Sequence, residues 1–182
     1  LHIASVGNKM ILDLPINFHK QYHKWNSLGK RLNAYIITKT SVQFCFEIET
    51  GKKKEVNTHI GIDSGINVLA SCSTGNQYGQ DIKECVARVK RCKHGSEGQK
   101  TARRALRQRI DEITKELIIK ENPDLIVVEQ LKNLGKKTKA KRLLAKNIRR
   151  SIGIWNWRYW LNRLQQQCEE NRVSFRSVSP YN

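Results

Sequence analysis

The first third of the chain carries the alternation of apolar and polar positions that is typical of β-strands. Residues 10–16 alternate in this way, and residues 32–38 and 42–49 are rich in β-branched and aromatic side chains. Only a short polar turn separates the last two segments, so they predict an antiparallel hairpin. We therefore predict a β-rich segment over residues 1–57, which contains a basic turn at Thr50 to Lys54.

From residue 59 onward, short apolar runs alternate with helical periodicity. We predict strands over residues 59–63, 68–73 and 77–79. A basic helix follows, is interrupted at residues 94–98, and gives way to a second helix that ends before Asn122-Pro123, because proline disfavours a helical conformation in the residue before it. The apolar stripe of this second helix consists of Ala102, Leu106, Ile110, Ile113 and Leu117.

The run Leu125 to Glu129 is continuously apolar up to its last residue, as expected for a parallel strand buried on both faces. We expect it to lie beside the strand at 59–63. A long helix is predicted over 145–170 and a last strand over 173–178. The buried stripe of the long helix would be Ile154, Trp157, Leu161, Leu164 and Cys168. This succession predicts an α/β, RNase H-like mixed sheet flanked by helices over residues 58–182.

Two of these strands end in a carboxylate, namely Asp63 and Glu129. A carboxylate at the end of an apolar strand is costly to desolvate unless a cation or hydrogen bonds compensate. Two such strands side by side would direct both acids at one metal site, and two oxygen ligands suit Mg²⁺, for which Mn²⁺ can substitute. Two alternatives stay open: Asp63 could cap the Ser64-Gly65 turn, and Glu129 could pair with a lysine.

The net charge is +18, from 34 Lys and Arg against 16 Asp and Glu. Residues 83–109 hold ten basic residues against Glu84 and Glu97, and residues 132–150 hold nine with no acid. Such clusters attract a polyanion, and neutralising phosphates releases counterions, so we expect DNA or RNA as the partner. A solvated surface or an acidic lipid headgroup is the alternative, but no amphipathic helix with an apolar aromatic face accompanies the charge, and no apolar run approaches the roughly 20 residues of a membrane span, so no membrane partner is expected. The candidate nucleic-acid-binding residues are Lys90, Arg91, Arg103, Arg104, Arg107, Lys136, Lys137, Lys139, Lys141, Arg142, Arg149 and Arg150.

Four aromatic residues lie within six positions, and they cannot all face one way on a helix. Core packing is the expectation for Trp157, whereas Trp155 and Tyr159, at i and i+4, could stack on a base, and we add Trp155 to the nucleic-acid-binding set. The five cysteines are odd in number and include no Cys-x-x-Cys pair, which predicts free thiols in a reducing compartment and no zinc site within these residues.

Taken together, several of these motifs resemble the RuvC domain of TnpB-type transposon-encoded nucleases and of the related miniature type V CRISPR effectors. The motifs are Gly61-Ile62-Asp63-Ser64-Gly65, Val68-Leu69-Ala70, Ile126 to Leu134, Ile154-Trp155-Asn156-Trp157 and Val178-Ser179-Pro180-Tyr181. Residues 1–57 resemble the C-terminal part of that family's β-barrel wedge domain.

The resemblance implies an RNA-guided, Mg²⁺-dependent DNA endonuclease of the prokaryotic cytoplasm, associated with the nucleoid, with DNA and a guide RNA as partners. Asp63 and Glu129 match the family's metal-binding and catalytic positions. A third Asp and a four-cysteine zinc ribbon are expected beyond residue 182, so the chain is read as a fragment of a larger protein that is weak or inactive alone.

Two other functions are compatible with the residues. A nuclease-inactive nucleic-acid-binding module, such as an RNA-guided repressor or a domesticated transposase remnant, would share the basic segments. The Gly-x-Asp-x-Gly pattern also occurs in actin-like and Hsp70-like ATPases, but a second loop of the Asp-x-Gly-Gly type is missing from the sequence.

Overall fold

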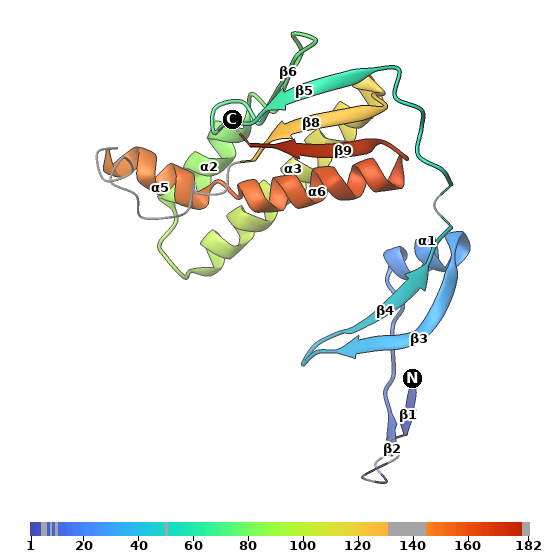
Figure 1. The fold of residues 1–182 in the computed structure, drawn as a ribbon. Helices are drawn as coiled ribbons and strands as arrows, with labels where there is room; N and C mark the ends of the chain where they lie inside the picture. Colours follow the sequence, from blue (N-terminus) through green and yellow to red (C-terminus); the bar gives the residue numbers. More distant parts are fainter. Residues whose placement is uncertain (5–6, 8, 10, 50, 131–144, 180–182) are drawn as a thin grey trace. The chain divides into compact units, whose positions relative to one another are not determined.

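The computed structural model describes residues 1–4, 7, 9, 11–49, 51–130 and 145–179 (Figure 1). Contacts divide the chain into two compact units, Leu1–Thr50 and Gly51–Asn182. The division lies a few residues before the boundary predicted at residue 57, because the connecting segment bonds to the larger unit. The Lys54 N–H donates to the carbonyl of Arg172 at 3.1 Å, and the Lys54 ammonium donates to Asn122 Oδ1 at 3.0 Å.

The smaller unit contains two separate two-stranded antiparallel sheets and one helix. Its elements are β1 (His2–Ala4), β2 (Ile11–Asp13), α1 (Lys20–Leu28), β3 (Lys30–Ile37) and β4 (Val42–Glu47). The predicted hairpin is confirmed as β3 and β4, in which Ile37 pairs with Val42. The strand predicted at residues 10–16 is shorter than expected. Helix α1 was not predicted, since its sequence is polar and none of its residues is buried.

Aromatic side chains hold the smaller unit together. The rings of Phe18 and Tyr22 stack with centroids 4.0 Å apart, and Tyr22 also contacts Phe44 and Phe46 edge-on at 5.3 and 5.5 Å. None of the described residues of this unit is buried. Few apolar contacts therefore oppose its opening, and we expect it to unfold locally at lower cost than the larger unit.

A five-stranded mixed sheet forms the centre of the larger unit. Its strands are β5 (His59–Asp63), β6 (Ala70–Cys72), β7 (Gln77–Tyr78), β8 (Leu125–Glu129) and β9 (Ser174–Val178). Their order across the sheet is β7-β6-β5-β8-β9, with β8 parallel to both of its neighbours and β6 antiparallel to both of its own. Three antiparallel strands followed by two parallel ones, in this order, are the RNase H-like arrangement, and the predicted fold class is confirmed.

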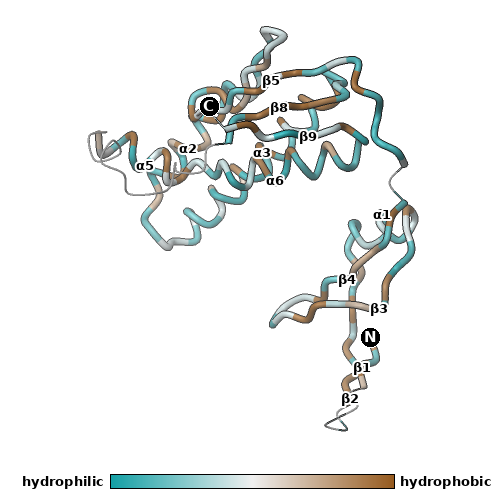
Figure 2. Tube along the Cα trace, in the orientation of Figure 1, coloured by the Kyte–Doolittle hydropathy of each residue, from teal (hydrophilic) through white to brown (hydrophobic). Residues whose placement is uncertain are grey.

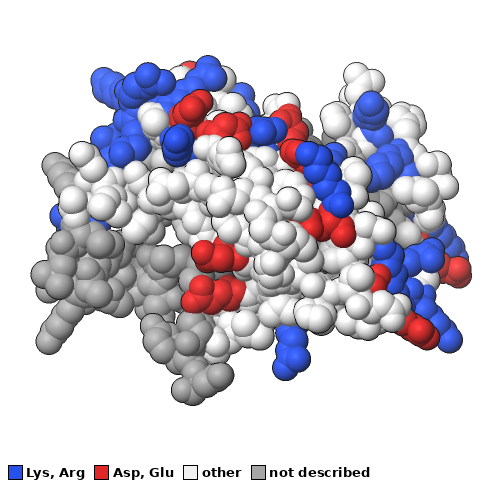
Figure 3. Space-filling model, turned by 90° about the horizontal axis from the view of Figure 1, so that it is seen from above, with Lys and Arg blue, Asp and Glu red and all other residues white. Residues whose placement is uncertain are grey.

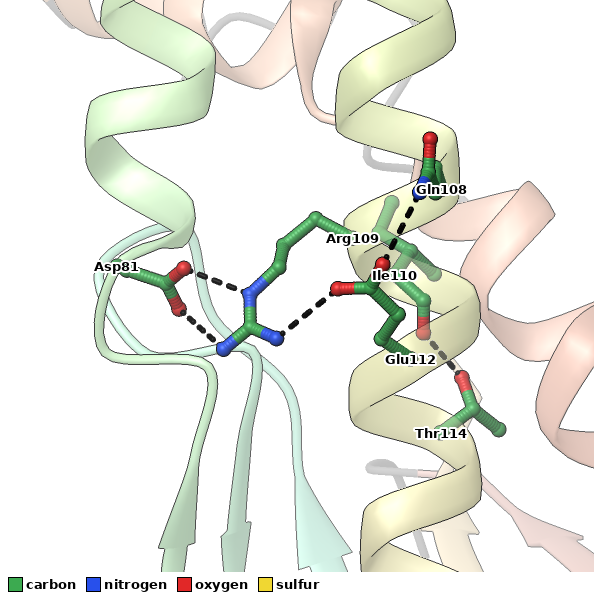
Figure 4. Close-up of polar contacts among 6 residues, drawn as sticks. All are labelled: Asp81, Gln108, Arg109, Ile110, Glu112 and Thr114. Carbon is green, nitrogen blue, oxygen red and sulfur yellow. Dashed lines mark hydrogen bonds and ion pairs between the residues drawn. The ribbon is translucent and has the colours of Figure 1, made fainter.

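Helices α2 (Ile82–Arg91) and α3 (Glu97–Glu121) carry the basic segment and pack against one another. The predicted apolar stripe of α3 is confirmed, since each of its five residues is at most 3% exposed. The start of α2 is tied to α3 by Arg109, whose guanidinium pairs with Asp81 at 2.7 Å and with Glu112 at 3.2 Å (Figure 4). The helix ends at Asn122, whose left-handed backbone (φ 39°) lets its N–H bond to the carbonyl of Ile118.

The single helix predicted over 145–170 is wrong. The structure has two helices, α5 (Lys146–Ile154) and α6 (Trp157–Glu170), separated by an extended residue at Trp155 (φ −61°, ψ 112°). The break allows Trp155 and Trp160 to enter the core together, at 4% and 1% exposure. On one continuous helix the neighbouring aromatic residues would have to point in several directions.

Burial within the sheet alternates between its two faces. Figure 2 shows β8 as an apolar strand, but only Ile126 and Val128 are fully buried, at 0% and 2%, whereas Leu125, Val127 and Glu129 are half-buried. The expectation that β8 is buried on both faces is therefore wrong. The strand side chains on one face belong to the same core cluster as the buried residues of α3 and α6. Among the helices that the structure describes, none has the length and apolarity needed to cross a membrane.

Candidate metal and nucleic-acid sites

Asp63 and Glu129 are the last residues of two adjacent parallel strands. The register between β5 and β8 runs from His59 opposite Leu125 to Ile62 opposite Val128, and its continuation places Asp63 opposite Glu129. Strands of a sheet are about 4.8 Å apart. The structure therefore brings together two residues that are 66 positions apart in the sequence, as the sequence analysis predicted.

Both carboxylates project from the same face of the sheet. Successive side chains of a strand point to opposite faces, and the buried residues Ile62 and Val128 occupy the helix-covered face. Asp63 and Glu129 must then occupy the other face, where Asp63 is exposed and Glu129 half-buried. Both acids therefore keep some solvent exposure on this face.

Neither of the two carboxylates has a hydrogen-bond or ion-pair partner among the residues described. Asp63 does not cap the turn that follows it, and Glu129 does not pair with a lysine there, so neither alternative from the sequence is supported within that part of the chain. Two neighbouring like charges repel each other. A divalent cation would relieve this repulsion, and two carboxylates are ligands of the type that Mg²⁺ prefers.

Within the described ranges, no group of three or more His, Cys, Asp or Glu side chains could hold a metal ion. The site in this part of the chain thus consists of two acids, and the expected third Asp and the zinc ribbon remain predictions. Mg²⁺ retains several waters and needs few protein ligands, so a two-carboxylate set still fits it.

Other acids of the larger unit are engaged with partners. The Asp81 carboxylate accepts hydrogen bonds from Arg109, which hold the pKa of Asp81 below its usual value. Asp124 accepts from the backbone N–H and the hydroxyl of Thr58 at 2.9 Å each, and these bonds lower the pKa of Asp124. These structural roles distinguish Asp81 and Asp124 from Asp63 and Glu129, which have no partner among the residues that the structure describes.

Three residues that the sequence did not nominate fix the strand end at Asp63. Ser73 Oγ accepts from the Gly61 N–H at 3.0 Å, and the Ser73 N–H donates back to the Gly61 carbonyl at 2.9 Å. On the other side, the indole N–H of Trp160 donates to Ser64 Oγ at 3.0 Å. The position of Ser64 directly after Asp63 was the available signal, but Trp160 lies 96 residues away and no local pattern connects it to the site.

Some of the predicted basic residues are exposed to solvent, and others make contacts within the protein. Arg91, Arg103, Arg104 and Arg149 are exposed, on α2, α3 and α5. Basic side chains form groups on the surface seen in Figure 3. These four guanidinium groups are available to phosphates.

Three of the other predicted basic residues make contacts within the protein. The Lys90 ammonium donates to Ser151 Oγ at 3.1 Å, and the Arg150 guanidinium donates to the carbonyl of Lys90 at 2.9 Å, so these two residues join α2 to α5. The Arg107 guanidinium lies 5.5 Å from the ring centroid of Tyr159. The remaining predicted residues, Lys136, Lys137, Lys139, Lys141 and Arg142, lie outside the described residues.

The proposed role of Trp155 in base stacking needs correction. Its side chain is 4% exposed and packs in the core, which leaves no ring face for a base. Tyr159 is also engaged, because its hydroxyl donates to the Asp111 carboxylate at 2.9 Å. We therefore remove Trp155 from the nucleic-acid-binding set.

No protein-family model matches the sequence, and no curated protein matches it. A comparison with solved structures finds a chain of the "Cryo-EM structure of the Cas12f1-sgRNA-target DNA complex". The two chains are 16% identical and superpose with a TM-score of 0.49. The match covers 78% of this chain and 33% of the Cas12f1 chain, so this chain spans about a third of the length of the protein it is similar to.

Proposed function

We propose that this chain is the RuvC-type nuclease part of an RNA-guided, TnpB-like protein that hydrolyses phosphodiester bonds in DNA with Mg²⁺. The observation that carries the proposal is the carboxylate pair Asp63 and Glu129, which lie at the ends of the adjacent parallel strands β5 and β8 and have no partner among the described residues. The two like charges repel each other, and a divalent cation bound between them would relieve this repulsion.

In this function Asp63 and Glu129 would hold the divalent ions. Bound there, two such ions activate a water and stabilise the leaving oxygen in phosphodiester hydrolysis. Asp63 and Glu129 provide the negative charge that would attract the cations. The ends of β5 and β8 hold these two carboxylates in place. Asp63 is exposed, as a residue that contacts a phosphate-bound cation would have to be.

The exposed guanidinium groups of Arg91, Arg103, Arg104 and Arg149 would bind the phosphates of the nucleic-acid backbone. Phosphate contacts by Arg fix the position of a strand without reading its sequence. This is the division of labour expected of a protein whose target is selected by a guide RNA, because base pairing then supplies the specificity.

The direct test is a Mn²⁺ soak of the crystallised protein with anomalous diffraction. We expect density between Asp63 and Glu129, absent from the Asp63→Ala variant and retained in Glu84→Ala, which alters an exposed acid on α2. A structure with the two carboxylates more than about 10 Å apart would end the proposal, because paired metal ions lie only about 4 Å apart.

The second candidate is a nuclease-inactive nucleic-acid-binding module. The observation that favours it is that no third acid joins Asp63 and Glu129 within the described ranges. Cleavage of DNA by the full-length protein, lost in Asp63→Ala, would exclude it. Binding without cleavage, unchanged by the same substitution, would establish it.

A further inference from the structure

The turn that follows Asp63 is tied to the helix layer by a side chain from the distant end of the sequence. The Trp160 indole N–H, on α6, donates to Ser64 Oγ at 3.0 Å. Trp160 is 1% exposed and Ser64 is half-buried, and a buried donor left without its acceptor is costly. Since Ser64 directly follows Asp63, the bond fixes the point at which the chain leaves β5.

Backbone contacts hold the same turn from within the sheet. Asp63 pairs with Ser71 of β6, and the Gly65 N–H donates to the carbonyl of Val68 at 3.1 Å. These contacts set the path of the turn along the sheet. The Trp160 bond adds a link to the helices behind it, so the turn is held from two directions.

Trp160 is itself held in place by its neighbours on α6. The Tyr159 hydroxyl donates to both oxygens of Asp111 on α3, at 2.9 and 3.0 Å. Arg163, three residues after Trp160 on the same helix, pairs with the same carboxylate at 3.0 Å. Rotation of α6 would break both contacts, so the indole N–H is presented at a fixed position.

We propose that Trp160 and Ser64 are positioning residues that hold the Asp63 carboxylate in the geometry required by the divalent cation. This inference rests on the proposed metal-binding role of Asp63. A site of this kind must keep its ligands within about 0.5 Å of the productive geometry. Groups that orient metal ligands typically change metal affinity by about 10–100-fold, and we expect the lower end because this bond acts through the neighbouring residue.

The test measures the Mn²⁺ affinity of the whole chain by electron paramagnetic resonance of the free ion. We expect Trp160→Phe and Ser64→Ala each to weaken binding by about 10-fold. The double variant should bind no more weakly than the weaker single variant, because both changes remove the same bond. Ser64→Thr, which keeps the hydroxyl, should restore the wild-type affinity.

The matched control is Trp157→Phe. Trp157 lies on the same helix and packs against the same core. Its substitution by Phe also removes an indole N–H, but not the one that bonds to Ser64. We expect its Mn²⁺ affinity to stay within about 2-fold of wild type. Ser64→Ala keeps the Trp160 ring, so a folding defect in Trp160→Phe leaves the test intact.

Two results would separate the failure of this inference from the failure of the proposed function. Wild-type affinity in Trp160→Phe and Ser64→Ala, together with loss of binding in Asp63→Ala, would overturn the positioning role and keep the metal site. Equal affinity in Asp63→Ala and wild type would overturn both. In the metal-free protein, amide hydrogen exchange over residues 63–68 should be faster in both variants, and unchanged exchange would also overturn the positioning role.

Discussion

The carboxylate pair predicts that removing one charge has opposite effects on stability with and without metal. In Asp63→Asn the side chain keeps its shape but loses its charge, so the repulsion from Glu129 disappears. Two unit charges about 5 Å apart interact by about 0.8 kcal/mol in water and about 3 kcal/mol at an effective dielectric constant of 20. Asp63 is exposed and Glu129 half-buried, so screening by water places the repulsion near the lower value, about 1 kcal/mol.

The measurement is urea unfolding of the larger unit in EDTA at low ionic strength, followed by circular dichroism. We expect the free energy of unfolding to be about 0.5–1 kcal/mol greater for Asp63→Asn than for wild type. In 1 M NaCl the Debye length is about 3 Å, so the difference should largely disappear. This salt series is an internal control, because a change in packing would not depend on salt.

Addition of Mn²⁺ should reverse the order of stability. A ligand at 100 times its dissociation constant stabilises the folded state by about 2.7 kcal/mol. Wild type should gain this amount, whereas Asp63→Asn should gain little, because one ligand has lost its charge. The reasoning would be refuted if Asp63→Asn were no more stable than wild type in EDTA, or if Mn²⁺ stabilised the two proteins equally.

Three further predictions concern the rest of the larger unit. Arg104→Gln should lower the slope of log affinity for double-stranded DNA against log salt by about 0.9, and Lys120→Gln, whose ammonium pairs with a carboxylate, should change it less. Burial opposes the ionisation of Glu121, but hydrogen bonds from Tyr78 and two other side chains lower its pKa. The ionised Glu121 therefore stabilises the folded state above the ordinary pKa of Glu, and this stabilisation is lost as the pH falls through the lowered pKa. Urea unfolding at pH 6 and pH 3.5 should therefore show a smaller acid loss in Glu121→Gln. Burial raises the pKa of Cys168 to about 12, so iodoacetamide at pH 8 should leave it unmodified in the folded protein, and mass spectrometry detecting its rapid alkylation would contradict this.

The sheet and the carboxylate pair could be predicted because local patterns carry the information. The apolar run of β8 and the apolar stripe of α3 each show a periodicity that identifies a strand or a helix. Once the two strands that end in an acid are paired, their two carboxylates form a candidate site. The parallel direction of β8 is expected because β7, the two helices and β8 form a strand–helix–strand crossover, and β7 runs parallel to β5 since β6 is antiparallel to both.

Other parts depended on tertiary contacts that no local pattern reveals. The break between α5 and α6 exists because Trp155 and Trp160 both reach the core, which a single helical period does not predict. Likewise, a basic side chain reads the same in the sequence whether it faces solvent, as Arg104 does, or joins two helices, as Lys90 does. The bond from Trp160 to Ser64 could not be found because it connects residues that are distant in the sequence.

The smaller unit shows a second limit. Its hairpin was evident from β-branched and aromatic composition, but α1 has no apolar stripe and no buried residue. Its helical conformation depends on the ring contact between Phe18 and Tyr22 and on the cap that His19 provides to the N–H of Gln21. Periodicity cannot predict a helix whose support comes from the residues beside it.

The register of β5 and β8 makes the site sensitive to the length of its strands. Because side chains alternate with a period of two, inserting or deleting one residue within 59–63 or 125–129 would turn one carboxylate to the opposite face of the sheet. Substitutions at Leu125 or Val127 leave the alignment unchanged. Relatives that keep this site should therefore vary freely in the identity of the strand residues on this face, but hardly at all in the number of residues before each acid.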